Sequence, residues 1–433
     1  MNLSGAKVVV VGMARSGIAA VELLREKGAM VRAVDQNPVA IPGIEVEPQR
    51  AEAFAGAELI VISPGVPADL DVLNDARTGG VRVIGDLELA SWFLQGEIIG
   101  ITGSNGKTTT TALTGHILNG AAQVGGNIGT PPCSMVKTSR PGRWNVLELS
   151  SFQLETSEKF RAHIGACLNL TPDHLDRHGT IANYAEMKAR LFTHQRASDF
   201  AVLNADDAMC RGYAHRGAGK PLWFSSTQTV APGACVDRES ILLDGEPLMP
   251  ISEIPLRGMH NVENTMAAAV IAKLAGARHQ QIRERVRTFP GVEHRLEFVR
   301  ELDGVAWYND SKATNVDATL KAIDAFDGKL WIILGGKDKN SDYSPLGAPL
   351  SKKAHGALLI GAAASKIAAQ LNAAIPLEQC GTIDGAIRFA FEHAKPGDTV
   401  LLAPACASFD QFDNYEHRGR EFKRLVRELP WRN

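Results

Sequence analysis

The chain has 433 residues, of which 45% are hydrophobic and 22% charged, and its formal net charge is −2. A chain of this length is too long for a single hydrophobic core, so we expect two to four domains. The composition is that of an ordinary globular protein. The charge argues against a general nucleic-acid binder, which would be strongly basic. The six cysteines are scattered without a C-x-x-C pair, and the apolar runs fall short of the roughly 18 residues that a membrane span needs. We therefore expect a cytoplasmic protein without nucleic-acid or membrane partners.

The first predicted domain, residues 1–92, begins like a Rossmann fold. Lys7–Val11 contains four valines and is typical of a buried strand, and a helical pattern follows it as far as Gly28. Further strands are expected at Val31–Val34 and Leu59–Ile62. Strands that alternate with helices predict a parallel sheet.

A glycine-rich turn, Gly12-Met13-Ala14-Arg15-Ser16-Gly17, joins the first predicted strand to its helix. Ala14 replaces the middle glycine of the dinucleotide fingerprint, and Asp35 ends the next strand, where a ribose-binding acid would lie. The turn could belong to a nicotinamide dehydrogenase, to a nucleotide-sugar site or to a tight turn that binds nothing. A nucleotide-sugar site fits best, because it needs diphosphate contacts and no hydride chemistry. A dehydrogenase would also leave the next glycine-rich loop unexplained.

The second predicted domain, residues 93–290, contains the clearest motif of the chain. After the strand Glu97–Thr102 comes Gly103-Ser104-Asn105-Gly106-Lys107-Thr108-Thr109, followed by a helix. This context is typical of a phosphate loop, in which Lys107 reaches the outer phosphates of ATP and the Thr108 hydroxyl binds Mg²⁺. Ile101 stands where the general motif has its first glycine, so the loop is a variant. The alternative is a plain turn before a helix.

Two polar side chains follow the later strands of this domain, which are expected at 146–149, 166–170 and 201–204. Glu148 lies at one strand end and His174 just beyond the next, where ligands of α/β sheets gather. Both are candidate metal ligands, although a lone histidine is more often structural. Lys188 reads locally as a helix-surface lysine. Asn261 is a candidate N-cap of a helix at Val262–Leu274.

The third predicted domain, residues 291–433, follows a hinge at Pro290-Gly291. Strands are expected at 306–308, 330–334, 357–360 and 399–402. Polar loops follow three of them, at 309–315, 335–339 and 404–410. Loops at the strand ends of one sheet predict a binding site. Arg295, just past the hinge, is a candidate phosphate clamp.

Several of these motifs together resemble the Mur ligase family. The resemblance runs through Gly103–Thr109, Glu148, His174, His260–Asn264, His294-Arg295 and Asp310-Ser311-Lys312. Within the family, the chain most resembles members that add glutamate to UDP-N-acetylmuramoyl-L-alanine. The stretches that support this narrower resemblance are Glu148–Leu154, Asn309–Asn315 and Ser408–Tyr415. The resemblance implies an α/β protein with an N-terminal Rossmann-like domain for the UDP-sugar, a central ATPase-like parallel sheet and a C-terminal Rossmann-like domain for glutamate.

The resemblance also implies roles for single residues. It implies ATP contacts at Asn261, Arg295 and Asp310 in addition to the phosphate loop. It implies magnesium ions, two in number, held by Thr108, Glu148, His174 and a carbamylated Lys188, and catalytic roles for Lys107, Glu148, His174 and Lys188. The UDP-sugar contacts are expected at Gly12, Arg15, Ser16, Asp35 and Asn127, and the glutamate contacts at Lys312, Thr314, Lys339, Ser408 and Tyr415, the last of which is Phe in the family member compared.

The expected reaction is an ATP-dependent amide-bond ligation through an acyl phosphate, carried out by a monomer. The sequence leaves open whether D- or L-glutamate is added. A folylpolyglutamate synthase would share the phosphate loop but lacks the Rossmann-like block before it. A P-loop switch that hydrolyses ATP slowly would form no amide product.

Overall fold

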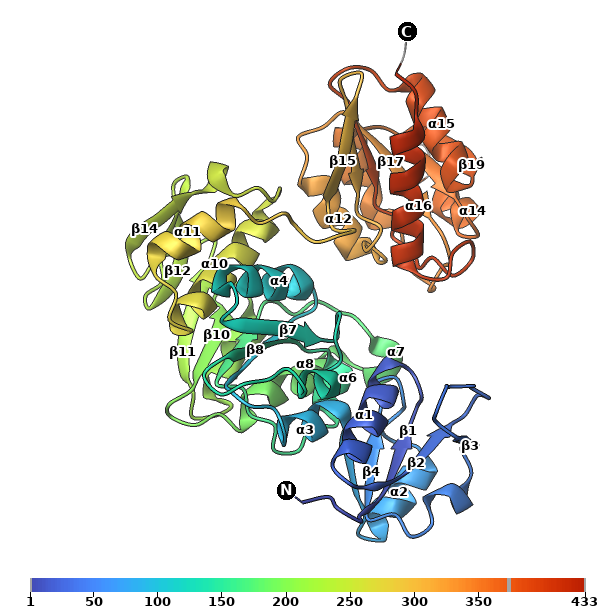
Figure 1. The fold of residues 1–433 in the computed structure, drawn as a ribbon. Coiled ribbons are helices and arrows are strands. Elements are labelled where there is room, and N and C mark those ends of the chain that lie inside the picture. The colour runs from blue at the N-terminus through green and yellow to red at the C-terminus, as the bar shows by residue number, and fades with distance from the viewer. Residues whose placement is uncertain (1, 372–374, 432–433) are drawn as a thin grey trace. The chain divides into compact units, whose positions relative to one another are not determined.

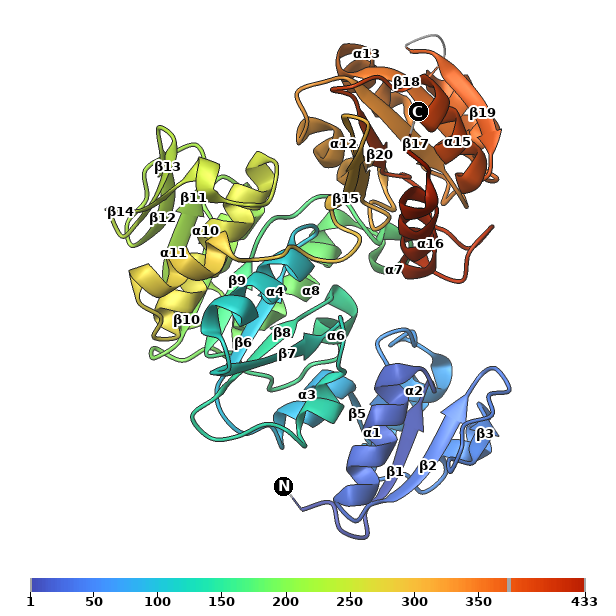
Figure 2. The ribbon, with the colours of Figure 1, turned by 45° about the horizontal axis from the view of Figure 1, so that its top comes forward.

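The computed structural model describes residues 2–371 and 375–431 and contains three mainly parallel sheets, each flanked by helices (Figure 1, Figure 2). This confirms the α/β class and the three-domain architecture. The chain forms two compact units: residues 1–253 with 263–289 carry the first two sheets, and residues 254–262 with 290–433 carry the third. The residue boundaries of the three domains stay a prediction. Within the described residues, no helix has the length and apolar character needed to cross a membrane.

The N-terminal sheet has five parallel strands in the order β3-β2-β1-β4-β5. Its elements are β1 (Lys7–Val11), α1 (Arg15–Glu26), β2 (Met30–Asp35), β3 (Val46–Pro48), the 3₁₀ turn η1 (Ala51–Phe54), β4 (Leu59–Ile62), α2 (Asp71–Thr78), β5 (Arg82–Gly85) and α3 (Asp86–Ser91). Val8 and Val10 pack into the core on one face of the sheet, and Val9 and Val11 pack into the core on the other. A strand covered on both faces has no polar alternation, which explains the continuous run of valines.

Within the described residues, the central sheet has nine strands in the order β14-β13-β12-β11-β10-β9-β6-β8-β7. The pairs β12–β13 and β13–β14 are antiparallel, and the other pairs are parallel. The strands of its parallel part are β6 (Ile98–Thr102), β7 (Ala122–Gly126), β8 (Trp144–Glu148), β9 (Ile164–Cys167), β10 (Phe200–Asn204), β11 (Lys220–Ser225) and β12 (Gly233–Asp237). The strands β13 (Ser240–Leu243) and β14 (Glu246–Pro250) follow β12, and β14 forms one edge of the sheet. The helices are α4 (Lys107–Leu118), α5 (Pro132–Met135), α6 (Ser151–Glu155), α7 (Leu175–His178), α8 (Ile181–Thr193), α9 (Ala208–Arg211), α10 (Met259–Leu274) and α11 (His279–Arg287), with 3₁₀ turns at Gly212–His215 and Ile251–Glu253.

The C-terminal sheet has six strands in the order β15-β16-β20-β17-β18-β19, and only β15 pairs antiparallel. Its elements are β15 (Glu297–Leu302), β16 (Val305–Asn309), α12 (Val316–Asp324), β17 (Leu330–Gly335), the 3₁₀ turn η4 (Ser344–Leu346), α13 (Gly347–Lys353), β18 (Ala354–Ile360), α14 (Ala364–Leu371), β19 (Leu377–Gly381), α15 (Ile383–His393), β20 (Thr399–Leu402) and α16 (Tyr415–Glu428). The neighbouring strands β16, β20 and β17 end in the three polar loops noted above, so the sheet order brings these loops together.

Two local expectations were wrong. β9 ends at Cys167, three residues before the predicted end, because the following residues leave the sheet to bind the phosphate loop. Asn261 is not an N-cap, because α10 already begins at Met259. Its side-chain amide donates instead to the Arg257 carbonyl at 2.7 Å.

Candidate active site

The predicted phosphate loop joins β6 to α4, as the motif requires. Gly106 lies directly before the helix in the left-handed region, with φ of +82°, and a Cβ atom there would lie 2.2 Å from Asn264 Oδ1. Only glycine fits this position. The helix begins at Lys107, and the side chains of Thr108 and Thr109 are buried. The loop therefore meets the positive end of a helix, which is an anion-binding geometry.

Two lysines converge on one carbonyl of this loop. Lys107 Nζ donates to Gly103 O at 2.9 Å and to Ser104 O at 2.8 Å. Lys188 Nζ, from α8, donates to Gly103 O at 2.8 Å and to Thr102 Oγ1 at 3.2 Å. Burial, together with the nearby charge of Lys107, lowers the pKa of Lys188 to about 7. The loop thus holds one ammonium group and one amine that can lose its proton near neutral pH.

The interpretation of Lys188 as a surface lysine was wrong, because its side chain is buried. The sequence carried a signal for this. Lys188 is spaced four residues after Tyr184 and three before Leu191, so it shares the apolar face of α8 with buried neighbours. A lysine on such a face needs either a polar partner or a lowered pKa.

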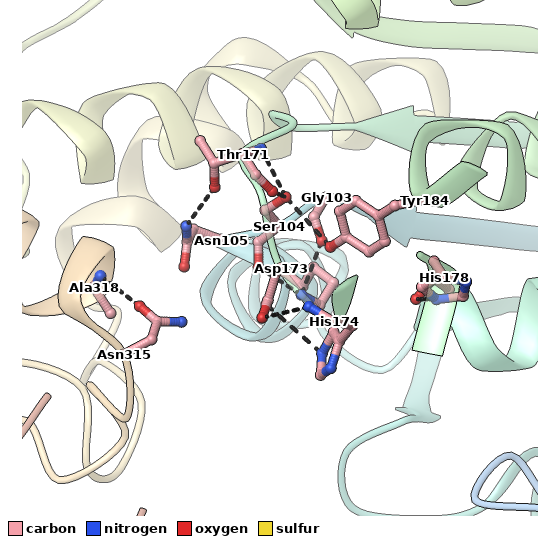
Figure 3. Close-up of polar contacts among 12 residues, drawn as sticks. Gly103, Ser104, Asn105, Thr171, Asp173, His174, His178, Tyr184, Asn315 and Ala318 are labelled. Atoms are coloured by element: carbon pink, nitrogen blue, oxygen red, sulfur yellow. Dashed lines mark hydrogen bonds and ion pairs between the residues drawn. The ribbon is translucent and has the colours of Figure 1, made fainter. Parts of the chain in front are cut away.

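The segment after β9 binds the phosphate loop by side chain and backbone (Figure 3). Asn105 N donates to Asn169 Oδ1 at 2.8 Å, and Ser104 Oγ donates to Thr171 O at 2.8 Å. The Tyr184 hydroxyl lies 3.3 Å from Ser104 Oγ. Asn169, Thr171 and Tyr184 are contacts that the sequence did not predict, since their partners lie more than 60 residues away. They fix the loop before a ligand arrives.

Glu148 lies at the end of β8, as predicted, and its side chain is buried. Its Oε1 accepts a hydrogen bond from Asn127 Nδ2 at 2.9 Å. Its Oε2 is buried and has no hydrogen-bond partner within residues 2–371 and 375–431. A buried carboxylate oxygen without a donor is costly unless a cation or a water satisfies it. Glu148 therefore fits the predicted role of metal ligand.

His174 is placed differently from Glu148. It lies at the start of α7 with φ of +52°, its side chain is about half exposed, and its Nε2 lies 3.6 Å from Asp173 Oδ2 (Figure 3). In the part of the chain that the structure describes, no three His, Cys, Asp or Glu side chains are grouped to hold a metal. The predicted set contains only two such side chains, Glu148 and His174. The other donors would be the Thr108 hydroxyl and a carboxylate formed on Lys188.

The first glycine-rich turn opens onto a cavity of about 530 Å³. All five predicted UDP-sugar residues line it: Gly12, Arg15, Ser16, Asp35 and Asn127. The sequence did not single out Gln153, Asn37 or the loop 63–67, which also line the cavity. The lining residues come from both the N-terminal and the central parts of the first compact unit. Arg15 Nη2, from the N-terminal part, donates to Gly129 O of the central part at 2.9 Å.

Asp35 supports this first turn. Its Oδ2 accepts a hydrogen bond from Met13 N at 2.6 Å, and its Oδ1 accepts one from Asn37 N at 2.9 Å. The carboxylate thus uses one of the turn's own backbone donors. Asp35 has a structural role here that the ribose-binding argument did not include.

The three polar loops of the C-terminal sheet are joined by backbone hydrogen bonds. Ala405 N donates to Ala313 O at 2.9 Å, and Lys337 N donates to Ala407 O at 2.9 Å. Lys312 Nζ donates to the Tyr415 hydroxyl at 3.1 Å, so two predicted glutamate contacts meet. The others are spread along the loops: Thr314 is half-buried, Ser408 is buried and Lys339 is exposed.

Arg418 is the main residue of this site that the sequence did not reveal. It is buried on α16, and its guanidinium donates to Ser311 Oγ at 2.9 Å, Ser311 O at 2.8 Å, Cys406 O at 3.2 Å and Ala407 O at 3.3 Å. Burial lowers its pKa to about 10. One side chain therefore ties two of the polar loops together. Its spacing of four residues before the buried Phe422 was the available signal.

The predicted nucleotide contacts of the C-terminal unit include a buried acid. Burial raises the pKa of Asp310 to about 7, while the nearby Arg295 guanidinium acts to lower it. Asn261 is buried in its contact with Arg257. Asn264, which belongs to the first compact unit, lies against the phosphate loop, where it accepts a hydrogen bond from Thr110 Oγ1 at 3.3 Å. The roles of Asn261, Arg295 and Asp310 as nucleotide contacts stay a prediction.

A phosphate loop, a second ligand cavity and three α/β sheets define a nucleotide-binding α/β protein of several domains. Comparison with known proteins narrows this class. Family models match in three consecutive parts: the Mur ligase MurD-like N-terminal domain at residues 6–85, the Mur ligase middle domain at 101–272 and the Mur ligase glutamate ligase domain at 294–406. The chain belongs to the Mur ligase family.

The relatives cover almost the whole chain. A UDP-N-acetylmuramoylalanine–D-glutamate ligase of Solibacter usitatus is 58% identical over 438 residues, or 99% of each chain. One of Acidobacterium capsulatum is 50% identical over 98% of this chain and 97% of its own. Among solved structures, the MurF ligase of Thermotoga maritima in complex with ADP is similar with a TM-score of 0.63 and 17% identity, over 99% of this chain and 96% of its own. UDP-N-acetylmuramate–alanine ligase of the same organism matches with a TM-score of 0.63 and 17% identity, over 97% of this chain and 99% of its own. The structural similarities establish the fold alone.

Proposed function

We propose that this chain is an ATP-dependent ligase that adds D-glutamate to UDP-N-acetylmuramoyl-L-alanine in peptidoglycan synthesis. The observation that carries the proposal is the hydrogen bond from Asn127, on the cavity wall, to Glu148. Glu148 pairs in the sheet with Ile101, two residues before the phosphate loop. A nucleotide-sugar carboxylate and ATP can therefore be brought to one place. The choice of D-glutamate follows the names of relatives that share 58% and 50% of their residues with this chain.

The proposed reaction has two steps. The substrate carboxylate attacks the γ-phosphorus of ATP, ADP leaves, and an acyl phosphate forms. The neutral amine of glutamate then attacks the acyl carbon, inorganic phosphate leaves, and the amine proton passes to solvent or a base. The protein contributes mainly positioning and charge neutralisation. Lys107 offsets the repulsion between the carboxylate and the triphosphate.

Magnesium would supply further charge neutralisation at the phosphates. The chain's own candidates to hold it are Glu148, through its unpartnered Oε2, the Thr108 hydroxyl, His174 and a modified Lys188. A carboxylate and a hydroxyl oxygen are donors that Mg²⁺ prefers. We propose two ions, in line with the family.

We further propose that Lys188 carries a carbamate. Its amine, with a pKa lowered to about 7 by burial and by Lys107, is neutral in a good part of the molecules at physiological pH. The neutral amine attacks CO₂, a C–N bond forms, and one proton is released as the carbamate anion appears. The anion would offset Lys107 and add an oxygen ligand for the metal. In ¹³C-bicarbonate, wild-type protein should give a carbamate signal in ¹³C NMR that Lys188→Ala lacks and the exposed-lysine control Lys159→Ala keeps. A signal retained in Lys188→Ala contradicts this assignment.

The remaining contacts follow from charge. Lys312 and Lys339 can meet the carboxylates of glutamate, with Thr314, Ser408 and Tyr415 as hydrogen-bonding partners. Asn261, Arg295 and Asp310 would hold the nucleotide. Arg418 would act on glutamate indirectly, by fixing the loops that carry Lys312 and Ser408.

The experiment is a phosphate-release assay with purified protein, ATP, Mg²⁺ and UDP-N-acetylmuramoyl-L-alanine, with D- or L-glutamate. The expected result is phosphate release that requires D-glutamate, with an amide product identified by mass spectrometry. Release with L-glutamate alone would leave the ligase class standing and overturn the isomer. Release that ignores the acceptor and yields no amide would favour a P-loop switch.

A further inference from the structure

The loop after β7 lies directly on Glu148. Asn127 makes two hydrogen bonds to this one residue: its side-chain Nδ2 donates to Glu148 Oε1 at 2.9 Å, and its backbone N donates to Glu148 O at 2.8 Å. The preceding Gly126 has φ of +109°, and a Cβ atom there would lie 2.2 Å from Glu148 O. The close approach therefore requires glycine, and it fixes Asn127 against the carboxylate.

The same asparagine faces a ligand cavity. Asn127 and Gly126 line the cavity of about 530 Å³ at the first glycine-rich turn. Glu148 is almost fully buried at 1% exposure, and the hydrogen bond from Asn127 engages one of its two oxygens. The other oxygen, Oε2, is buried without a hydrogen-bond partner in the described residues. Asn127 thus stands between a cavity for an organic ligand and a carboxylate oxygen that is suited to a cation.

We propose that Asn127 is a positioning residue that couples ligand binding in the cavity to divalent-cation binding at Glu148. The inference rests on the proposed function, from which it takes the UDP-sugar and the cation. The amide holds Oε1, so the rotation of the carboxylate is set and Oε2 keeps one direction. A ligand that packs on Asn127 holds this amide on Oε1 and so keeps the carboxylate in the direction that presents Oε2 to a cation. Such coupling is reciprocal, so the cation raises the affinity for the UDP-sugar by the same factor as the UDP-sugar raises the affinity for the cation.

A purely structural role for Asn127 makes a different prediction. If the amide only held the loop after β7 on the end of β8, its removal would lower stability and both affinities but leave the coupling factor between the two ligands unchanged. The coupling factor between the two ligands therefore separates the two roles, whereas activity alone does not.

The test uses the full chain, Mn²⁺ as a paramagnetic probe of the cation site, and UDP-N-acetylmuramoyl-L-alanine without ATP. The dissociation constant of Mn²⁺ is measured by electron paramagnetic resonance with and without saturating UDP-sugar. We expect the UDP-sugar to lower it by about fivefold or more in the wild type, the lower end of ordinary coupling. In Asn127→Ala the factor should fall below about twofold. Asn37→Ala, which changes another amide on the wall of the same cavity, should weaken the UDP-sugar and keep the coupling.

The outcomes separate this inference from the function on which it rests. Wild-type protein that binds neither Mn²⁺ nor the UDP-sugar overturns both. Wild-type protein that binds both without coupling overturns the inference alone, and so does full coupling in Asn127→Ala. If Asn127→Ala fails to fold, wild-type protein without coupling still overturns the inference, and Asn127→Ser serves as the second variant.

Discussion

The two glycine-rich turns of the first compact unit share a topology and differ in charge. Each joins a buried parallel strand to a helix, β1 to α1 and β6 to α4. At the first turn a carboxylate, Asp35, accepts a backbone N–H of the turn. At the second, two lysines donate to the backbone carbonyl of Gly103. One turn is supported by a carboxylate and the other by two lysine side chains.

This difference shows how the same strand–turn–helix backbone can bind two different ligands. A helix N-terminus attracts anions in both turns. The second turn adds the ammonium group of Lys107, which suits a triphosphate whose negative charge shifts toward the leaving group during phosphoryl transfer. The first turn has given one of its N–H groups to Asp35, so it keeps fewer backbone donors for the diphosphate of a nucleotide-sugar. Its own cation, Arg15, lines the same cavity.

The strongest way to break the comparison is to remove the cation from the second turn. Lys107→Ala should lower kcat/KM for ATP by about 10²–10³, the usual effect of removing one preorganised charge from a transition state. The affinity for the UDP-sugar should stay unchanged, because the first turn has its own support. Steady-state kinetics for ATP and calorimetry for the UDP-sugar check the two halves.

The matched control is Lys159→Ala, which removes an exposed lysine of the same domain and should leave both quantities unchanged. Equal losses for ATP and for the UDP-sugar in Lys107→Ala would mean that the two turns form one electrostatic site. The distinction drawn above would then be wrong.

The second lysine of this turn predicts a pH dependence of stability. The folded pKa of Lys188 is about 7, against an ordinary value of 10.5. Between these two values the unfolded chain binds a proton that the folded chain does not, so the free energy of unfolding rises with pH across this window. One proton contributes at most about 1.4 kcal/mol per pH unit. Lys188→Met removes this contribution and should flatten the profile.

Urea unfolding at pH 7, 8 and 9 in CO₂-free buffer measures this slope, since carbamylation would add a proton release of its own. Lys220→Met, at an exposed lysine, is the control and should keep the wild-type slope. A slope in Lys188→Met as steep as in the wild type would show that Lys188 stays protonated in the fold.

The comparison also shows how far the sequence could be interpreted. Both turns were predicted, because a strand, a glycine-rich turn and a helix form from neighbouring residues. The side chains that hydrogen-bond to the turns from distant positions in the sequence were predicted less well. Lys188 reaches Gly103 across 85 positions and Asn169 reaches Asn105 across 64, and no local pattern records such pairings. Arg418 is a similar case, because its partners Ser311 and Cys406 come from loops that only the sheet order makes neighbours.

The first turn can be tested through its carboxylate. Asp35→Ala removes the acceptor of Met13 N and should weaken UDP-sugar binding by about tenfold, in line with about 1.5 kcal/mol for a hydrogen bond to a charged group. The KM for ATP should not change. Asp244→Ala is a matched control, because Asp244 Oδ1 accepts a hydrogen bond from Gly233 N at the same 2.6 Å in the central sheet. Calorimetry that finds equal UDP-sugar affinities in Asp35→Ala and wild type would leave Asp35 without a role in the cavity.

The smallest expected effect concerns a single hydroxyl at the first turn. Ser63 Oγ donates to Gly12 O at 2.7 Å, and both residues line the cavity. Ser63→Ala loses one neutral hydrogen bond, about 0.5–1.5 kcal/mol, and should weaken UDP-sugar binding by about threefold. Ser91→Ala removes a hydroxyl-to-carbonyl bond of the same 2.7 Å, to Glu88 O on α3. It should cost similar stability without changing UDP-sugar affinity. Titration of the UDP-sugar into both variants tests this prediction. Equal UDP-sugar affinities in Ser63→Ala and Ser91→Ala would mean that the first turn keeps its shape without the Ser63 hydroxyl. Asp35 alone would then remain as the contact that distinguishes the first turn from the second.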